Sequence, residues 1–180
     1  SKAFSYAGER IGVTCVSDKL YSRRYDALAE RYEGLPFGQV FSTRMLYALS
    51  SGTSHSAQFA MTAMLKAAVE GTYDFRKEVG VYGERARRLK DIFCKHGFYI
   101  VYDKDLDEPV ADGFYFTIGY PHMTSGQLAH ELMYYGVSAI CLITTGSRQE
   151  GLRVCTSFIG DHQYKLLEER MKIFETNNPV

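Results

Sequence analysis

The chain has 180 residues, of which 46% are hydrophobic and 23% charged, the composition of an ordinary globular protein with one good core, or one core and a smaller subdomain. Lysine plus arginine and aspartate plus glutamate number 21 each, so no net charge favours nucleic acid or an anionic membrane as a partner. No apolar run approaches the roughly 18–20 residues of a transmembrane helix.

Residues 1–71 form the first of three regions. The run RIGVTCV, residues 10–16, is short, apolar and β-branched, which predicts a buried strand. Ser17 or Asp18 is expected to cap helical residues that extend to Glu33. Two further helices are expected at residues 37–49 and 54–69, the second with an apolar face at helical spacing. One strand cannot complete a sheet by itself, and we therefore expect the chain to be the C-terminal part of a larger protein.

Residues 72–97 are expected to form one long helix. Apolar residues recur at helical spacing from Phe75 to Phe93, Asp74 is a plausible N-cap, and Gly97 suits the position just after the helix. A narrow apolar stripe on a long charged helix is typical of an element that bridges two bodies.

Residues 98–180 show an α+β pattern. Strands are expected at residues 98–102, 113–119, 137–143 and 152–158. Thr124 and Gln127 form a capping box at the start of a helix that Gly136 ends, and Asp161 is expected to cap a last helix. This region therefore predicts a compact unit of strands and flanking helices.

The cysteines and histidines do not indicate a disulfide framework or a metal site. The four cysteines lack CxxC spacing and fall in apolar segments, so we interpret them as reduced core residues of a cytoplasmic protein. The five histidines lack the spacing of metal ligands. We expect no metal.

The opening residues SKAFSYAGERIG carry the most specific chemical signal. A lysine amine such as that of Lys2 can attack a carbonyl and form a Schiff base. Arg10, at the start of an expected buried strand, needs an anion, because an unpaired buried charge is very costly. A bound phosphate or carboxylate would satisfy its guanidinium group. A Schiff-base lysine and a phosphate-binding arginine together are the equipment needed to hold pyridoxal phosphate.

The pattern SK-x5-G-x-R-x-G, made by Ser1, Lys2, Gly8, Arg10 and Gly12, resembles the signature of the class I/II aminotransferases of fold type I, the aspartate-aminotransferase-like group. The resemblance implies that Lys2 carries the cofactor, pyridoxal 5′-phosphate, and that Arg10 contacts its phosphate. It extends along the chain, because SSGTSHSAQFAMTAML resembles the turn and small-residue helix that follow in the family, and GVSAI and GLRVCTSF resemble the two closing strands.

The resemblance also implies an architecture. In this reading residues 1–71 are a remnant of the large cofactor-binding domain, residues 72–97 are the interdomain helix, and residues 98–180 are the small domain, with a mainly antiparallel sheet and flanking helices. The family's cofactor-ring residues come from the half that precedes the lysine. We therefore expect the 180-residue chain alone to be inactive, and the intact enzyme to be a homodimer.

Arg153 is the expected substrate-binding residue. In the family, the arginine of the last strand binds the α-carboxylate of the amino acid. The sequence supports the same residue independently, because strand alternation places Arg153 on the opposite face from Leu152 and Val154, and an arginine in the middle of a strand needs an anion or a solvated edge. The alternative is an exposed ion pair across two strands.

Three functions remain open from the sequence. The first is an aminotransferase that moves an amino group between an amino acid and a 2-oxo acid, with Lys2 transferring the proton at the α-carbon. The second is a β-eliminating C–S lyase on the same scaffold, in which Lys2 and Arg153 would keep their positions. The third is a non-enzymatic α+β binding module, in which Lys2 and Arg10 have no catalytic meaning.

Overall fold

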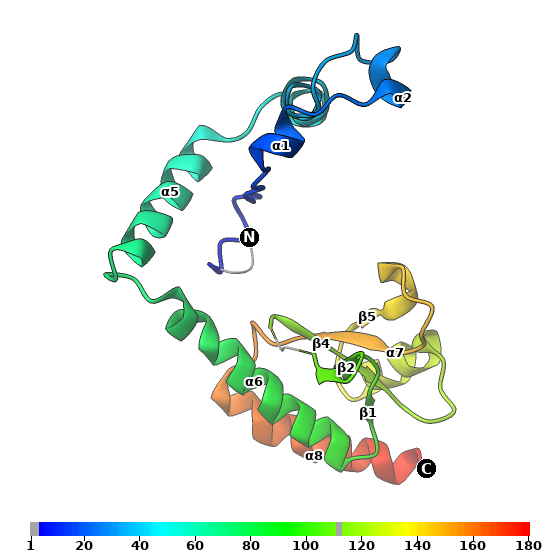
Figure 1. Ribbon diagram of the computed structural model, residues 1–180. Coiled ribbons are helices and arrows are strands. Elements are labelled where there is room, and N and C mark those ends of the chain that lie inside the picture. The colour runs from blue at the N-terminus through cyan, green and yellow to red at the C-terminus, as the bar shows by residue number, and fades with distance from the viewer. Residues whose placement is uncertain (1–3, 111–112) are drawn as a thin grey trace. The chain divides into compact units, whose positions relative to one another are not determined.

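The computed structural model describes residues 4–110 and 113–180. The chain divides into two units, residues 1–75 and 76–180. Helices and antiparallel strands are both present, and the fold class is α+β (Figure 1). The elements of the first unit are α1 (Asp18–Tyr21), α2 (Asp26–Ala29), α3 (Phe37–Gln39), the π-helix η1 (Val40–Leu46), α4 (Tyr47–Ser50) and α5 (His55–Val69). Those that follow are α6 (Phe75–Lys95), β1 (Tyr99–Ile100), β2 (Lys104–Asp105), β3 (Glu108–Pro109), β4 (Tyr115–Gly119), α7 (Ser125–Tyr134), β5 (Ile140–Cys141), the 3₁₀-helix η2 (Leu142–Thr145), β6 (Leu152–Cys155) and α8 (Asp161–Asn177).

The buried strand predicted at residues 10–16 is wrong. Residues 11–17 have no regular secondary structure, and the side chain of Val13 is 66% exposed. The described part of the first unit contains no other strand, so no partner is available for the backbone hydrogen bonds that a strand requires. The helical material expected as far as Glu33 is two short helices, of which α1 is capped by Ser17, whose hydroxyl accepts from the N–H of Leu20.

The helix predicted at residues 37–49 is present but contains the π-helix η1 in its middle. The hydroxyls of Ser42 and Thr43 donate to the carbonyls of Gly38 and Gln39 at 2.8 and 2.7 Å. Such back-bonding competes with the regular ladder of an α-helix, which accounts for the wider turn. The helix predicted at residues 54–69 is confirmed as α5, with Ser54 as its N-cap.

The first unit buries little apolar surface. Val40, Ala57 and Met61 are its buried hydrophobic residues among those described, whereas Phe59 and Val69 are 77% and 89% exposed. The core of the protein therefore lies in the second unit.

Four strands of the second unit form an antiparallel sheet in the order β1-β4-β6-β5. Residues that alternate along β4 and β6 are buried, and they pack with residues from α6, α7 and α8 into one core. The sheet contributes Phe116, Ile118, Leu152 and Val154, and the helices contribute Ala86, Leu89, Ile92, Phe93, Leu128, Leu132, Tyr164, Met171 and Phe174. The helices thus cover one face of this sheet and leave the other face open.

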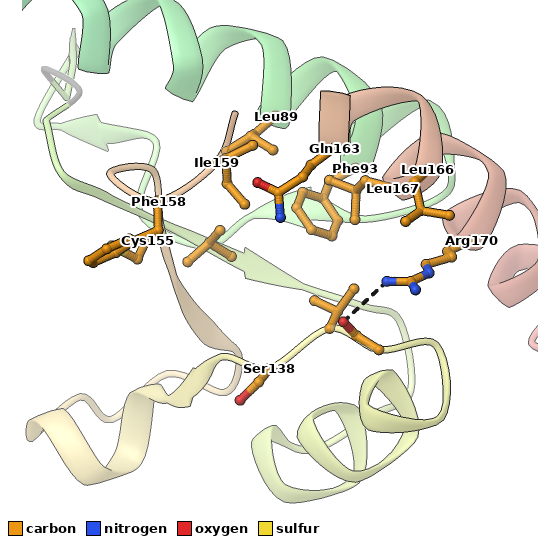
Figure 2. Close-up of a pocket in the computed structure, with 13 residues that line it drawn as sticks. Leu89, Phe93, Ser138, Cys155, Phe158, Ile159, Gln163, Leu166, Leu167 and Arg170 are labelled. Atoms are coloured by element: carbon orange, nitrogen blue, oxygen red, sulfur yellow. Dashed lines mark hydrogen bonds between the residues drawn. The ribbon is translucent and has the colours of Figure 1, made fainter. Parts of the chain in front are cut away.

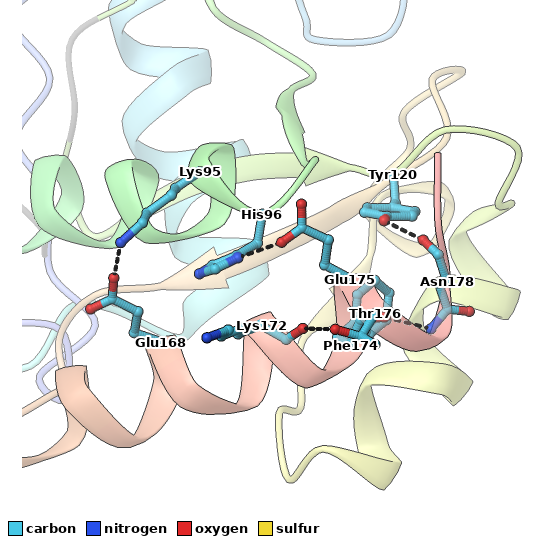
Figure 3. A network of polar contacts seen from close by, with 9 residues as sticks. All are labelled: Lys95, His96, Tyr120, Glu168, Lys172, Phe174, Glu175, Thr176 and Asn178. Carbon is cyan, nitrogen blue, oxygen red and sulfur yellow. Dashed lines mark hydrogen bonds and ion pairs between the residues drawn. The ribbon is translucent and has the colours of Figure 1, made fainter.

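Helices α6 and α8 lie side by side and are joined by polar contacts (Figures 1 and 3). The ammonium group of Lys95 pairs with the carboxylate of Glu168. Nδ1 of the buried His96 lies 2.7 Å from Oε2 of Glu175. The hydroxyl of Tyr120 donates to the backbone carbonyl of Asn178 at 2.5 Å. The first two contacts hold α8 against the end of α6, and the third ties the residue after α8 to the residue that follows β4.

The strands predicted at residues 98–102, 113–119 and 152–158 are present but shorter, as β1, β4 and β6, and the pair β2–β3 was not predicted. The capping box of Thr124 and Gln127 is confirmed at the start of α7. The strand predicted at residues 137–143 is only β5, which continues as the 3₁₀-helix η2. Asp161 is the first residue of α8 rather than its cap, because the N-cap is Gly160, whose N–H donates to Oε1 of Gln163.

The cysteines are free thiols, but they are not core residues. Cys15, Cys94 and Cys155 are exposed and Cys141 is half-buried. Cys15 is exposed because its expected strand does not form, and Cys155 because it lies at the end of β6 on the open face of the sheet.

Candidate functional site

Lys2, the expected cofactor lysine, lies outside the described residues. Arg10 is described and exposed, with a backbone φ of 52°. Its guanidinium group donates to the carbonyl of Ala7 at 3.0 Å. Arg10 is therefore positioned by a local turn, not by a strand.

The surroundings of Arg10 are open among the described residues. The Cβ positions that Gly8 and Gly12 lack face open space, with no heavy atom within 4 Å. The guanidinium group of Arg10 has donors left for an anion, since arginine carries five N–H donors. An exposed arginine with donors left over can serve as one phosphate contact.

Arg153 lies in the middle of the open face of the second unit's sheet. It belongs to β6, which pairs with β4 on one side and β5 on the other, opposite Thr117 and Ile140 respectively. Its neighbours Leu152 and Val154 are buried in the core. Strand alternation therefore places Arg153 on the uncovered face, as the sequence predicted.

The guanidinium group of Arg153 stacks on an aromatic ring. Its central carbon lies 4.4 Å from the centre of the Tyr115 ring. No carboxylate of the described residues forms an ion pair with Arg153. The exposed cross-strand ion pair that was the alternative for this residue is therefore not observed among them. A half-buried guanidinium held against a ring, without an acid beside it, can bind a carboxylate through two parallel hydrogen bonds.

Two contacts fix the edge of the open face near Thr117. The hydroxyl of Thr117 accepts from the N–H of Tyr102 at 2.9 Å, and the hydroxyl of Tyr102 lies 2.6 Å from that of Ser147. Because Tyr102 follows β1 and Ser147 follows η2, the two contacts tie both of these segments to the sheet beside Arg153.

A carboxylate anchors the start of β6 to the start of α7. Oε2 of Glu150 accepts from the N–H and the hydroxyl of the buried Ser125 at 2.6 and 2.5 Å. The hydroxyl of Ser125 in turn accepts from the N–H of Gly151 at 2.9 Å. The hydrogen bonds from Ser125 lower the pKa of the Glu150 carboxyl. This connection holds the strand that carries Arg153 in register with the helix behind it.

The sequence reasoning missed Tyr115, Thr117 and Glu150. A signal existed for Tyr115 and Thr117, because alternation along residues 114–118 placed both on the face opposite Phe116. Nothing local indicated which strand they would meet. Glu150 bonds to a residue 25 positions away, for which the sequence offers no pattern.

The described residues contain neither a cluster of metal ligands nor a membrane-spanning helix. Within residues 4–110 and 113–180, no three His, Cys, Asp or Glu side chains gather as a metal site. In the same described ranges, no helix has the length and apolar character needed to cross a membrane.

Comparison by sequence adds no relative. No protein-family model matches the chain, and a search of curated proteins finds no match. The candidate site, with Arg153 at its centre, is therefore supported by the residues of this chain alone.

Proposed function

We propose that the protein is a pyridoxal-phosphate-dependent aminotransferase of fold type I, in which Arg153 binds the α-carboxylate of an amino acid or 2-oxo acid substrate. The observation that carries the proposal is the position of Arg153 on the open face of the sheet, stacked on Tyr115 and without an acid partner among the described residues. A cation placed in this way is available to a ligand, because the ring holds the guanidinium group but leaves its donors free.

The residues of the second unit would bind and orient the substrate. The fork of Arg153 matches a carboxylate with two parallel hydrogen bonds, which fixes both the position and the direction of the bound acid. Tyr115 limits the movement of that fork, and the Glu150–Ser125 contact holds the start of its strand. Fixing a substrate in this manner lowers the entropic part of the activation barrier.

Pyridoxal phosphate, when bound, supplies an electron sink for the α-carbon of the amino acid. The roles of Lys2 as its point of attachment and of Arg10 as a phosphate contact rest on the motif resemblance. In this proposal the protein acts in the cytoplasm as a homodimer that includes the remaining cofactor-binding residues.

The decisive experiment is a cofactor titration of the complete gene product. We expect a near-visible absorption band from lysine-bound cofactor, lost in Lys2→Ala and retained in Arg153→Lys. Product analysis with a panel of amino acids then separates transamination, which yields a 2-oxo acid and an aminated acceptor, from β-elimination, which releases a thiol. Absence of the band at saturating cofactor would overturn the proposal and favour the non-enzymatic binding module.

A further inference from the structure

A cavity lies on the helix-covered side of the sheet, away from Arg153. It has a volume of about 280 Å³ and is lined by residues of α6, α8, β6 and the segments beside them (Figure 2). Its buried walls include Leu89, Phe93 and Val154. The volume is close to the lower end of small-molecule sites, about 300 Å³, so a bound ligand would be small.

The cavity carries one charge, and it is positive. Arg170 is the sole charged residue among the described residues that line it. No described carboxylate forms an ion pair with Arg170. Nη1 of Arg170 donates to the carbonyl of Gly136 at 3.4 Å, which is one use of five N–H donors. The remaining donors are available to an anion.

The Arg170 guanidinium group lies close to the backbone of Gly136. A Cβ atom added to Gly136 would lie 2.8 Å from Nη1 and 3.1 Å from the central carbon of the guanidinium group. Gly136 also has a φ of 67°, and this backbone conformation by itself disfavours a side chain there. The guanidinium group thus rests against the end of α7 at one end of the cavity, with Phe158 and Cys155 at the other (Figure 2).

Gln163 adds a second donor. Its Oε1 accepts from the N–H of Gly160 at 2.9 Å, as part of the cap of α8. Because this contact fixes the oxygen, the amide NH₂ is the group that remains for the cavity, where Figure 2 shows it pointing. The cavity therefore combines apolar walls, two sets of donors and no acid among its described residues.

We propose that this cavity binds a small organic carboxylate with an apolar body, such as an arylalkanoic or branched-chain acid. The carboxylate pairs with Arg170, and the apolar body packs on Phe93, Val154 and Leu167, towards the amide of Gln163. The site is separate from the proposed substrate site, because Arg153 and Val154 lie on opposite faces of the same strand.

A ligand titration of the 180-residue chain tests this site. The probes are 3-phenylpropionate, its neutral counterpart 3-phenyl-1-propanol, and acetate, followed by calorimetry and by the methyl signals of Val137, Val154 and Leu167 in carbon–proton correlation spectra. We expect saturable shifts of these methyls with 3-phenylpropionate, and affinities at least about tenfold lower for the alcohol and for acetate, which lack the charge and the apolar body respectively.

Three variants locate the binding. Arg170→Met removes the cation and should lower the affinity about tenfold or more. Gln163→Glu keeps the acceptor for the N–H of Gly160 but adds a negative charge to the cavity wall, and should weaken binding of the acid with α8 still capped. Arg153→Met is the matched control, because it removes the other candidate carboxylate site and should leave these methyl shifts unchanged.

Equal binding of the acid and the alcohol would overturn the proposal, as would unchanged affinity in Arg170→Met or no methyl shift at millimolar 3-phenylpropionate. Loss of the methyl shifts in Arg153→Met would mean that the acid binds on the open face of the sheet. That result would also overturn the proposal. If Arg170→Met fails to fold, the difference in affinity between the acid and the alcohol, measured on the unmodified chain, still tests whether the cavity binds a carboxylate.

Discussion

The guanidinium carbon of Arg153 lies 4.4 Å from the centre of the Tyr115 ring, and the two residues come from neighbouring antiparallel strands. Arg153 faces Thr117 directly, so Tyr115 reaches it from the next position on the same face, two residues along β4. This diagonal contact is within the reach of an aromatic side chain. It positions a cation on the open face of the sheet.

The Arg153–Tyr115 contact should be measurable as a coupling free energy. A double-mutant cycle with Arg153→Met and Tyr115→Leu, followed by urea unfolding of the 180-residue chain, should give a coupling of about 0.5–1 kcal/mol, the usual strength of an exposed cation–π pair. Tyr115→Phe keeps the ring and should keep the coupling. Strictly additive effects of the two substitutions would contradict the contact.

Arg153→Lys should severely lower kcat/KM for the amino acid in the intact enzyme. Lysine cannot form the two parallel hydrogen bonds of a guanidinium fork, and loss of a charge-assisted pair in a closed site costs roughly 2–5 kcal/mol of transition-state binding, by analogy with buried charge pairs at interfaces. Cofactor binding should survive, because Lys2 and Arg10 are unchanged. Steady-state kinetics and cofactor titration of the same preparation provide the measurement. Loss of cofactor with normal turnover of the residual holoenzyme would show that Arg153 is not the carboxylate anchor.

The Glu150–Ser125 contact should make stability depend on pH in the acid range. The folded protein lowers the pKa of Glu150 below its ordinary value of 4.5, so the unfolded chain binds the proton more readily. The contribution to the free energy of unfolding is therefore fully present above pH 4.5 and is lost as the pH falls through the lower folded-state pKa. Chemical denaturation from pH 7 to pH 3 should show the unmodified chain more stable than Glu150→Gln at neutral pH, with the difference shrinking below pH 4.5. A constant difference across this range would contradict the assignment.

Gly136→Ala and Gly126→Ala should change stability in opposite directions. Gly136 has a φ of 67°, and an added Cβ would lie 2.8 Å from the Arg170 guanidinium group, so the alanine should destabilise by more than about 1 kcal/mol. Gly126 lies inside α7, where an added Cβ meets no atom within 4 Å, and its alanine should stabilise by about 0.4–1 kcal/mol. Thermal unfolding of both variants measures the contrast. A Gly136→Ala variant as stable as the unmodified chain would contradict the left-handed backbone conformation at this position.

Phe174→Ala should strongly destabilise the protein, because α8 packs into the same core as the sheet. Phe174 is fully buried, with its ring centre about 5 Å from those of Phe98 and Tyr120. Removing it should cost about 3–5 kcal/mol. The adjacent Ile173 is 55% exposed, and Ile173→Ala should stay within about 0.5 kcal/mol. Similar losses for the two variants in urea unfolding would mean that α8 is not docked in this way.

The sequence by itself determined those features that depend on residues a few positions apart. The capping box of Thr124 and Gln127, the N-cap at Ser54 and the positive φ of Gly136 are satisfied by local hydrogen bonds or local backbone geometry. The placement of Arg153 on the opposite face from its buried neighbours also follows from strand alternation alone. Helix periodicity likewise predicted the long helix α6 and the apolar face that it buries.

Tertiary structure decided what depends on partners distant in sequence. Residues 11–17 are as apolar and β-branched as a strand, but a strand forms only where another backbone completes its hydrogen bonds, and the described part of the first unit offers none. Tyr115 and Arg153 are 38 residues apart in the sequence, and they meet only because β4 pairs with β6. The cavity beside Arg170 likewise exists because α7 ends against α8, which are separate elements in the sequence. Local patterns specify which face of an element is apolar, whereas the partner of that face is set by the packing of the whole unit.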